Sequence, residues 1–427
     1  MDQLRIIGGR PLRGEIHISG AKNAALPLMA ASLLAEEGVT LHRTPHLADI
    51  VTMSQLLTHC GVEVHISPAL PGMFGHTVSL KPSGHFLTDA PYDLVRKMRA
   101  SVLVLGPLIA RYGRATVSLP GGCAIGTRPI DLHLKGLEKL GARVTLEGGN
   151  VHAEAPEGLK GGEILFPFIT VTGTENIMMA ATLAKGVTRI VNAAKEPEVV
   201  DLAKLLKSMG ARIQGEGTDI ITIEGVSMLS GASHTIIPDR VEAGTYLAAV
   251  AITNGDVELL GIDLDMLSVV RGELTEVGLA FEQTSQGVRV YRRDKQAPLK
   301  AVSIKTEPYP GFPTDLQAQM MALMTVAQGA STITETIFEN RFMHVAELLR
   351  MGADIEIHGS SAVVKGVKRL KGAPVMATDL RASASLVIAA LAAEGETIVN
   401  RIYHLDRGYE NMEMKLSNCG ASIARIT

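Results

Sequence analysis

Tryptophan is absent from the 427-residue sequence, and aromatic residues make up only 4% of it. Proteins that bind single-stranded nucleic acid commonly stack the bases on aromatic side chains, so this shortage argues against such a role. The net charge is −3, because 41 Lys and Arg residues face 44 Asp and Glu residues. A nucleic-acid partner requires a concentrated basic surface, which this balance does not predict. We therefore expect no nucleic-acid partner.

Cysteine is also scarce, and Cys60, Cys123 and Cys419 are far apart in the sequence. They form neither a CxxC metal motif nor the dense pattern of a disulfide-stabilised domain. The 13 histidines are scattered without metal-ligand spacing, and the phosphate-binding motifs GxxxxGK[ST] and GxGxxG are missing. The sequence thus predicts no metal and no cofactor.

Long apolar segments are missing as well. No run reaches the ~18 residues that span a membrane, and the first residues lack the basic and then apolar pattern of a signal peptide. We therefore expect no membrane association and a cytoplasmic location. The chain is longer than one hydrophobic core supports, so two or three domains are expected.

What the sequence does contain is a sixfold internal repeat. In each copy an apolar helical pattern leads to a glycine and then to a β-like run; these glycines are Gly38, Gly113, Gly186, Gly255, Gly329 and Gly395. A second helix-to-strand junction recurs in the same phase, at Gly61, Gly141, Gly210, Gly278, Gly352 and Gly420. We expect the glycines of the first series to be left-handed C-caps. Two series in phase indicate six copies of one unit.

Domain size divides the six copies into two domains of three. The first is predicted to cover residues 21–237. The second covers residues 1–20 and 238–427, so that the opening strand at 4–7 joins the C-terminal part of the chain. The Pro- and Gly-rich stretch 67–85 is expected to be a lengthened loop between strands.

Charged and hydroxyl residues gather where these helices are expected to begin. They are Lys22-Asn23, Arg99 to Ser101, Arg128, Thr172 to Glu175, Glu196 to Glu198, Asp239-Arg240, Asp315, Arg341, Arg381 to Ser383 and Asp406-Arg407. Helix N-termini present free N–H groups and a partial positive charge, which favour anions. If equivalent helices point the same way, these residues face one cleft between the domains.

Two interpretations of these residues remain open. Capping accounts for Ser101, Thr174, Asp239 and Asp315. It does not account for the cations, because a cation at a helix N-terminus opposes the helix dipole; these cations are Lys22, Arg99, Arg128, Arg341, Arg381 and Arg407. Several cations in matching positions favour a substrate that carries phosphate or carboxylate groups.

The stretch 119–133, LPGGCAIGTRPIDLH, is predicted to be a loop because it contains three glycines and two prolines. Cys123 lies in this loop, close to Arg128. A thiol beside a cation can be held partly as thiolate and can exchange a proton. Free cysteines more often serve as small apolar residues, and the residues alone do not decide between the two.

Two further segments carry candidate residues. In YPGFPTD, two prolines and a glycine deliver Asp315 to a helix start, where it is either an N-cap or a general base. In YHLDRGYE, Arg407 lies in a turn before a helix, and it contacts either a substrate or Asp406. A surface salt bridge of that kind contributes little to stability.

Taken together, these motifs resemble the UDP-N-acetylglucosamine 1-carboxyvinyltransferases, a family of enolpyruvyl transferases. They are Lys22-Asn23, the PGGCAIGTRPIDLH loop, YPGFPTD, ENRFMH at Arg341, TDLRASAS at Arg381 and YHLDRGYE. The resemblance extends over almost the whole chain. It implies an inside-out α/β barrel of two domains, each built from three βαβαββ repeats.

The resemblance also implies a reaction and roles for residues. Phosphoenolpyruvate would donate its enolpyruvyl group to the 3-hydroxyl of UDP-N-acetylglucosamine and release phosphate, the first committed step of bacterial peptidoglycan synthesis. Asp315 would deprotonate the hydroxyl and Cys123 would protonate C3, whereas Lys22, Arg128 and Arg407 would hold the phosphate and the carboxylate. The residues implied in substrate binding are Lys22, Asn23, Arg99, Arg128, Pro129, Ile130, Asp131, Leu132, His133, Phe168, Ile169, Thr170, Val171, Asp315, Ile337, Arg341, Arg381 and Arg407.

Two alternatives have the same implied fold. A shikimate-pathway enolpyruvyl transferase would use 3-phosphoshikimate as acceptor, but that family lacks this cysteine loop. A non-catalytic relative would bind sugar nucleotide and a partner protein, which the presence of Cys123, Asp315 and Arg407 argues against. The sequence identifies no partner protein.

Overall fold

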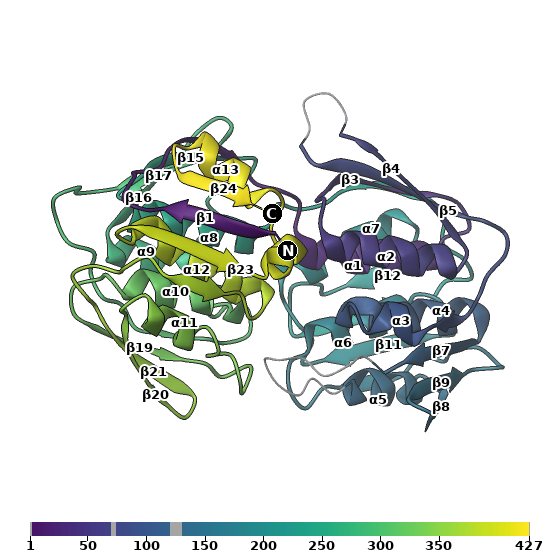
Figure 1. The fold of residues 1–427 in the computed structure, drawn as a ribbon. Coiled ribbons are helices and arrows are strands. Elements are labelled where there is room, and N and C mark those ends of the chain that lie inside the picture. Colours follow the sequence, from purple (N-terminus) through teal and green to yellow (C-terminus); the bar gives the residue numbers. More distant parts are fainter. Residues whose placement is uncertain (1, 70–73, 120–129, 427) are drawn as a thin grey trace. The chain divides into compact units, whose positions relative to one another are not determined.

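The structure is a computed structural model that describes residues 2–69, 74–119 and 130–426. These residues form six four-stranded sheets (Figure 1), one for each predicted repeat. The chain separates into two compact units. Residues 19–119 and 130–237 form the Lys22 unit, and residues 2–18 and 238–426 form the Asp315 unit; each is described by itself.

The Lys22 unit contains α1 (Lys22–Ala31), η1 (Ser32–Leu34), β3 (Val39–Thr44), α2 (Ala48–His59), β4 (Val62–Pro68), β5 (His76–Pro82), β6 (Asp89–Ala90), α3 (Tyr92–Val95), η2 (Arg99–Val104), α4 (Leu105–Tyr112), β7 (Arg114–Ser118), α5 (Asp131–Lys139), β8 (Arg143–Glu147), β9 (Asn150–Glu154), β10 (Glu163–Leu165), α6 (Val171–Ala181), β11 (Val187–Val191), α7 (Pro197–Ser208), β12 (Arg212–Gln214), β13 (Ile220–Glu224) and β14 (Ala232–Thr235).

The Asp315 unit contains β1 (Gln3–Ile7), β2 (Arg13–His17), α8 (Arg240–Ile252), β15 (Asp256–Leu260), α9 (Ser268–Val277), β16 (Leu279–Gln283), β17 (Gly287–Arg292), β18 (Ile304–Lys305), η3 (Thr314–Leu316), α10 (Gln317–Met324), β19 (Ala330–Thr334), α11 (Val345–Arg350), β20 (Asp354–His358), β21 (Ser361–Lys365), β22 (Pro374–Met376), α12 (Leu380–Ala392), β23 (Glu396–Asn400), η4 (Ile402–Arg407), α13 (Met412–Asn418) and β24 (Ser422–Ile426).

Every sheet has the same pattern of pairing. One pair of strands is parallel, as β18 and β19 are, and the two remaining pairs are antiparallel. In most repeats a buried helix joins the two parallel strands. Parallel neighbours need such a crossover, whereas antiparallel neighbours need only a turn. Three sheets are completed by a strand from a distant part of the chain. β14 pairs with β3, β2 pairs with β15, and β1 lies between β23 and β24.

The first helix of each repeat lies in the core of its unit. Almost every residue of α8, α10 and α12 is buried, and these three helices contact one another. A helix that is apolar on all sides is stable only when protein surrounds it. The second helices are buried on one face only, as in α9. Helices therefore fill the interior of each unit, and the sheets cover them.

The predicted role of the first glycine series is wrong for most of its members. Only Gly113 is itself a C-cap, with φ at 71°. Four of the other helices end earlier at a hydroxyl residue that donates to a carbonyl of the last turn, as Thr182 does to Met179 and Thr325 does to Ala322. In each case the hydroxyl adds a second hydrogen bond to a carbonyl that already accepts a backbone N–H at the helix end. The second glycine series does adopt positive φ in all six repeats.

The sequence predicted a loop over 67–85, but part of this stretch is a strand. β5 occupies 76–82 and pairs with both β4 and β3. The strand alternates buried Val78 and Leu80 with more exposed neighbours, which is the period expected of a half-buried strand. Each of the two strands ends at a proline, β4 at Pro68 and β5 at Pro82. Proline has no N–H group to donate to the ladder.

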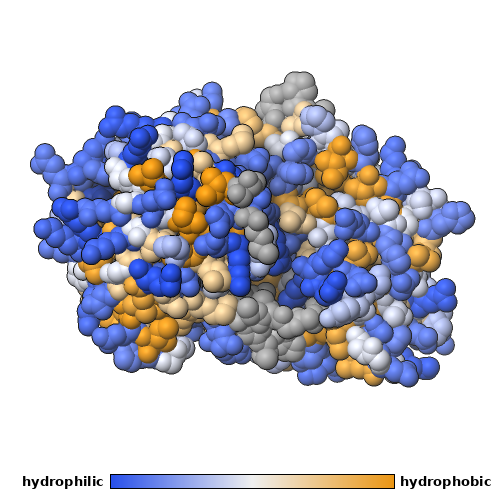
Figure 2. All heavy atoms as spheres, in the orientation of Figure 1, coloured by the Kyte–Doolittle hydropathy of each residue, from blue (hydrophilic) through white to orange (hydrophobic). Residues whose placement is uncertain are grey.

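The exposed surface is mainly hydrophilic on the face shown in Figure 2, and hydrophobic side chains occur there in scattered groups. Within the described ranges, no helix has the length and apolar character needed to cross a membrane.

Candidate functional site

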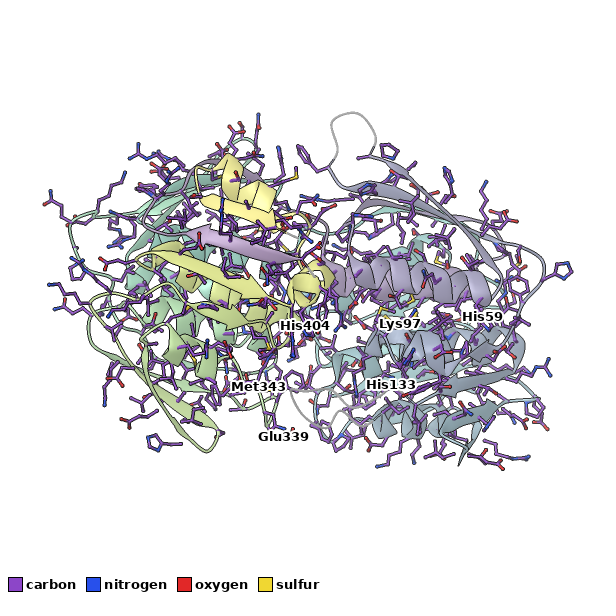
Figure 3. The ribbon with its side chains drawn as sticks, in the orientation of Figure 1. His59, Lys97, His133, Glu339, Met343 and His404 are labelled. Carbon is purple, nitrogen blue, oxygen red and sulfur yellow. The ribbon has the colours of Figure 1, made fainter. Side chains whose placement is uncertain are left out.

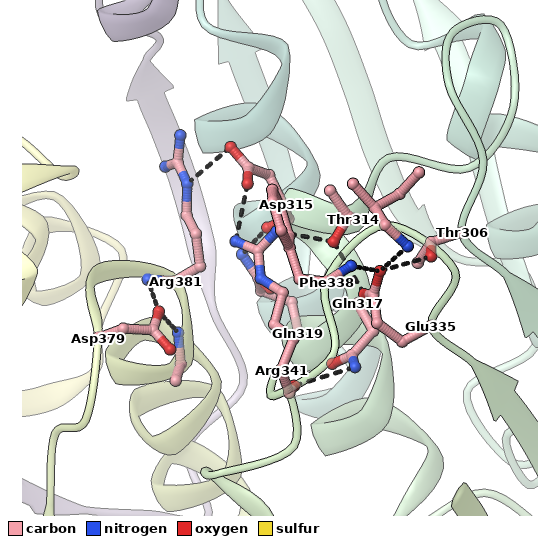
Figure 4. A network of polar contacts seen from close by, with 12 residues as sticks. Thr306, Thr314, Asp315, Gln317, Gln319, Glu335, Phe338, Arg341, Asp379 and Arg381 are labelled. Atoms are coloured by element: carbon pink, nitrogen blue, oxygen red, sulfur yellow. Dashed lines mark hydrogen bonds and ion pairs between the residues drawn. The ribbon is translucent and has the colours of Figure 1, made fainter. Parts of the chain in front are cut away.

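Asp315 lies between two guanidinium groups of the Asp315 unit (Figure 4). Its Oδ1 is 2.8 Å from Nη2 of Arg341, and its Oδ2 is 3.3 Å from Nε of Arg381. The two arginine side chains are almost completely buried, whereas the Asp315 side chain is 26% exposed. Adjacent cations favour the ionised form of a carboxyl group. Asp315 is therefore an accessible carboxylate that buried partners hold in place.

A buried carboxylate, Glu335, fixes the turn around Asp315. Its Oε2 accepts a 2.8 Å hydrogen bond from Oγ1 of Thr314, and its Oε1 accepts from Thr306 and from two backbone N–H groups at 337 and 338. Thr314 in turn accepts a 2.7 Å bond from Nη1 of Arg341. The guanidinium of Arg341 thus spans Thr314 and Asp315, and this fork fixes its orientation.

Arg381 is 2% exposed and stacks over the ring of Tyr409, 5.4 Å from the ring centroid. Burial is the largest single influence and opposes its charge, but Asp315, Tyr409 and Asp239 together outweigh burial and raise the pKa of Arg381 above its usual value. A permanently charged guanidinium in a dry site is a strong partner for anions.

In the Lys22 unit, Lys22 begins α1 and forms an ion pair with Asp49 at 2.7 Å. The exposed fractions of the two side chains are 6% and 5%. Asp49 lies in the first turn of α2, so the start of one helix supplies the counterion for the start of another. Removing one member of such a pair would leave an uncompensated buried charge.

His133, labelled in Figure 3, is held as a neutral ring near the start of α5. Asn176 is oriented by two backbone contacts, because its Oδ1 accepts from Gly106 N–H and its Nδ2 donates to the carbonyl of Val102. The same Nδ2 lies 3.0 Å from Nδ1 of His133, so Nδ1 is the acceptor and Nε2 carries the proton toward Thr172. Burial, assisted by the charge of Arg99, lowers the pKa of His133 to about 4.

His344 occupies the same position in its repeat, because it precedes Gly352 by as many residues as His133 precedes Gly141. It is 1% exposed, and burial lowers its pKa to about 4 as well. Its Nε2 has no hydrogen-bond partner among the described residues.

Several of the cations at the helix starts are neutralised within the protein, contrary to the reasoning that an anionic substrate must offset them. Three of the predicted cations already have carboxylate partners in the protein: Lys22 has Asp49, and Arg341 and Arg381 share Asp315. A cation at a helix start therefore does not by itself require an anionic substrate. The capping predictions are also partly wrong. Asp239 does cap α8, but Ser101 and Thr174 lie inside their helices, the cap of α6 is Thr170, and Asp315 lies within η3.

The remaining predicted residues fall into three groups. Asn23, Arg99, Asp131, Thr170 and Val171 lie at or next to helix starts, and Phe168, Ile169, Ile130 and Leu132 adjoin them in the chain. Phe168 is exposed. Ile337 follows β19, where its backbone N–H donates to Glu335, and Arg407 ends η4. Cys123, Arg128 and Pro129 lie outside the described residues. Asp406, the salt-bridge partner suggested for Arg407, pairs with Arg425 at 2.6 Å.

Sequence reasoning missed several residues of these clusters. Asp49 and Glu335 counter or orient predicted residues, and Asn176 fixes the tautomer of His133. A signal existed for Asp49, since it lies at the start of a second helix like other charged residues that the repeat pattern selected. Asn176 and Glu335 lie elsewhere in the repeat, where no pattern marks them.

The comparisons with known proteins agree over the whole chain. A family model described as EPSP synthase (3-phosphoshikimate 1-carboxyvinyltransferase) matches residues 6–416. Proteins named UDP-N-acetylglucosamine 1-carboxyvinyltransferase are similar to this chain at 60% identity in Paramagnetospirillum magneticum and 61% in Rhodospirillum centenum. Both matches cover 100% of this chain and 99% of the relative.

Two solved structures share the fold. The enolpyruvyl transferase NikO from Streptomyces tendae is 24% identical with a TM-score of 0.88, covering 100% of this chain and 99% of its own. An EPSP synthase from Acinetobacter baumannii is 17% identical with a TM-score of 0.75, covering 100% of both chains. These likenesses confirm the predicted two-domain fold of six βαβαββ repeats.

Proposed function

The chain belongs to the UDP-N-acetylglucosamine 1-carboxyvinyltransferases, within the wider EPSP synthase family, and we propose that it catalyses the reaction for which these enzymes are named. It transfers the enolpyruvyl group of phosphoenolpyruvate to the 3-hydroxyl of UDP-N-acetylglucosamine and releases phosphate. The reaction supplies peptidoglycan synthesis. The observation that carries the proposal is the full-length identity of about three residues in five to enzymes of that name.

The chemistry needs a base, an acid and cations. The hydroxyl oxygen forms a bond to C2 of the donor while C3 gains a proton; the C2–O bond to phosphate then breaks as C3 loses a proton. We assign the base to Asp315, which is partly exposed and held by Arg341 and Arg381. A carboxylate so positioned can accept the hydroxyl proton.

We assign the acid that protonates C3 to Cys123, on the strength of the family resemblance. A catalytic thiol must stay reduced, which fits the proposed cytoplasmic location. Lys22, Arg128 and Arg407 are assigned to the phosphate and carboxylate of phosphoenolpyruvate, and fixed cations would stabilise the charge that develops on the tetrahedral intermediate. Asp49 acts on Lys22, because it fixes the ammonium group at the start of α1.

The sugar nucleotide is assigned to Asn23, Arg99, residues 128–132, residues 168–171, Asp315 and Ile337. For His133 we propose an indirect part. Both its ring nitrogens face protein groups and it is 3% exposed, so it orders the start of α6 through Thr172 instead of contacting the ligand.

A phosphate-release assay tests the proposal. Phosphoenolpyruvate would be supplied with UDP-N-acetylglucosamine, with 3-phosphoshikimate or without acceptor. We expect release with the sugar nucleotide only. Release with 3-phosphoshikimate alone would favour the shikimate-pathway alternative, and binding of sugar nucleotide without any release would favour the non-catalytic relative.

A further inference from the structure

Gln319, labelled near Asp315 in Figure 4, belongs to a buried hydrogen-bond network within the Asp315 unit. It is 1% exposed and lies in α10, one turn after Asp315. Its Nε2 is 2.9 Å from the backbone oxygen of Asp315, 3.1 Å from Oγ1 of Thr245 and 3.0 Å from the hydroxyl of Tyr409. One amide group therefore joins η3, the core helix α8 and the segment after η4.

The direction of each hydrogen bond follows from the partners. The carbonyl oxygen of Asp315 can only accept, so the amide presents its nitrogen to this side. Thr245 donates its own proton to the carbonyl of Val241 at 2.8 Å. Its oxygen is then an acceptor for Gln319 and for the hydroxyl of Tyr409, which lies 2.9 Å away. The two protons of Nε2 are therefore shared among three acceptors, namely the carbonyl of Asp315, Thr245 and Tyr409. Oε1 of Gln319 has no partner among the described residues.

Tyr409 links this network to Arg381 and to the segment that carries Arg407. Its ring supports Arg381, the second cation on Asp315, and it follows Arg407 closely in the chain. Gly244, next to Thr245, lets η3 approach α8, since a Cβ there would lie 2.4 Å from Cδ1 of Leu316. The turn that carries Asp315 is thus packed closely on one side and hydrogen-bonded on the other.

We propose that Gln319 is a positioning residue for the reaction: it fixes the turn of Asp315 relative to Arg381 and to the segment that carries Arg407. This inference rests on the proposed function, because it assumes that Asp315 is the base. Gln319 itself touches no reacting atom. A displacement of about 1 Å in a catalytic group can lower a rate by about a hundredfold, so a buried amide that holds the backbone of Asp315 controls turnover.

The test compares three variants with the wild-type enzyme. Gln319→Met keeps the length of the side chain and removes its donors. Tyr409→Phe removes only the hydroxyl and leaves the ring under Arg381. Thr325→Val is the matched control, because Thr325 is equally buried at the end of the same helix and its hydroxyl serves only the carbonyl of Ala322 in the described structure.

We expect Gln319→Met to lower kcat by about 10- to 100-fold, while KM for UDP-N-acetylglucosamine changes by less than about threefold. Tyr409→Phe should lower kcat by about tenfold, and the double variant should be no slower than Gln319→Met, since both changes break one network. Thr325→Val should lower Tm and leave kcat unchanged.

Each outcome is informative. If folded Gln319→Met and Tyr409→Phe turn over at the wild-type rate and only Tm falls, Gln319 is structural and the inference is overturned. If Gln319→Met does not fold, Tyr409→Phe decides by the same criterion. If the wild-type protein releases no phosphate with UDP-N-acetylglucosamine, the proposed function fails and the inference fails with it.

Discussion

The Lys22 unit and the Asp315 unit place a histidine at the same position of the repeat, and only one of the two rings is fully hydrogen-bonded. His133 meets Asn176 and Thr172. The residues at the equivalent positions of the other unit are Ser385 and Arg381, judged by their distance from the closing glycines. Ser385 donates to Ala382 in its own helix and Arg381 pairs with Asp315, so Nε2 of His344 is left without a partner among the described residues.

The same comparison extends to the charged residues. Arg99 precedes Gly113 by as many residues as Asp315 precedes Gly329, and each begins or lies within the short helical turn before a core helix. One scaffold position therefore carries a cation in one unit and a carboxylate in the other. The repeat fixes where a side chain emerges, and its chemistry is set separately in each copy.

Stability should fall in acid because both histidines are buried and neutral. Unfolded histidine titrates near 6.5, whereas burial lowers the pKa of His133 and His344 to about 4. Between these values the unfolded state binds more protons, so the free energy of unfolding decreases as pH falls from 6.5 to 4 and levels off below that range. The loss is on the order of 3 kcal/mol per histidine at most. Urea unfolding across this pH range measures it.

A variant of each histidine sharpens this test. His133→Gln and His344→Gln should each reduce the pH dependence, and the double variant should reduce it most. Burial also lowers the pKa of His17 and of His404, so their contribution should remain in the double variant. Equal slopes in the wild type and the double variant would show that other groups dominate.

Asp49→Asn should destabilise the protein by about 3 kcal/mol, because it leaves Lys22 buried without its carboxylate. The paired variant Lys22→Met with Asp49→Leu should recover part of that loss, since it removes both charges. Denaturant unfolding at pH 7.5 compares them. A neutral effect of Asp49→Asn would mean that other groups near Lys22 compensate for its charge.

The hydrogen bonds of His133 and of His344 should differ in how much they stabilise the protein. His133→Leu should cost about 2 kcal/mol, because it leaves Asn176 and Thr172 without a buried partner. His344→Leu should cost less than about 1 kcal/mol, since its Nε2 contributes no hydrogen bond within the described structure. Thermal unfolding of both variants at one pH shows which variant loses more stability. A larger loss for His344→Leu than for His133→Leu would contradict the proposed difference in hydrogen bonding between the two units.

A further expected effect concerns the rate and not the stability, and it involves Arg381. Arg381→Lys keeps the charge beside Asp315 and loses the flat guanidinium that stacks on Tyr409. We expect kcat to fall by about tenfold, or about 1.4 kcal/mol. The Lys22 unit offers a control in Lys160→Arg, an exposed pair with Glu157, which should leave kcat unchanged.

The repeat was readable from the sequence because glycine is favoured at a left-handed position. The glycines from Gly61 to Gly420 mark all six second helices, and this spacing predicted the six sheets. The ends of the first helices were not readable in the same way. There a hydroxyl such as that of Thr182 ends the helix before the glycine, and Ser and Thr occur in many other places.

Asp315 could be selected from its local motif, but its partners could not be derived from position alone. Arg381 lies 66 residues further along the chain, and the two meet only because α10 and α12 are neighbours in the core. The contacts of Asp49, Glu335 and Asn176 could not be predicted for the same reason. A sequence pattern shows which side chains begin a helix, and the packing of helices decides which of them meet.

The account depends most on Asp315 as the base, and one rate tests it directly. Phosphate release from phosphoenolpyruvate with UDP-N-acetylglucosamine should be compared in the wild type and in Asp315→Asn, with folding checked by circular dichroism. We predict a decrease in kcat of at least about a hundredfold for a folded Asp315→Asn. A folded variant that releases phosphate within about threefold of the wild-type rate would contradict the assignment.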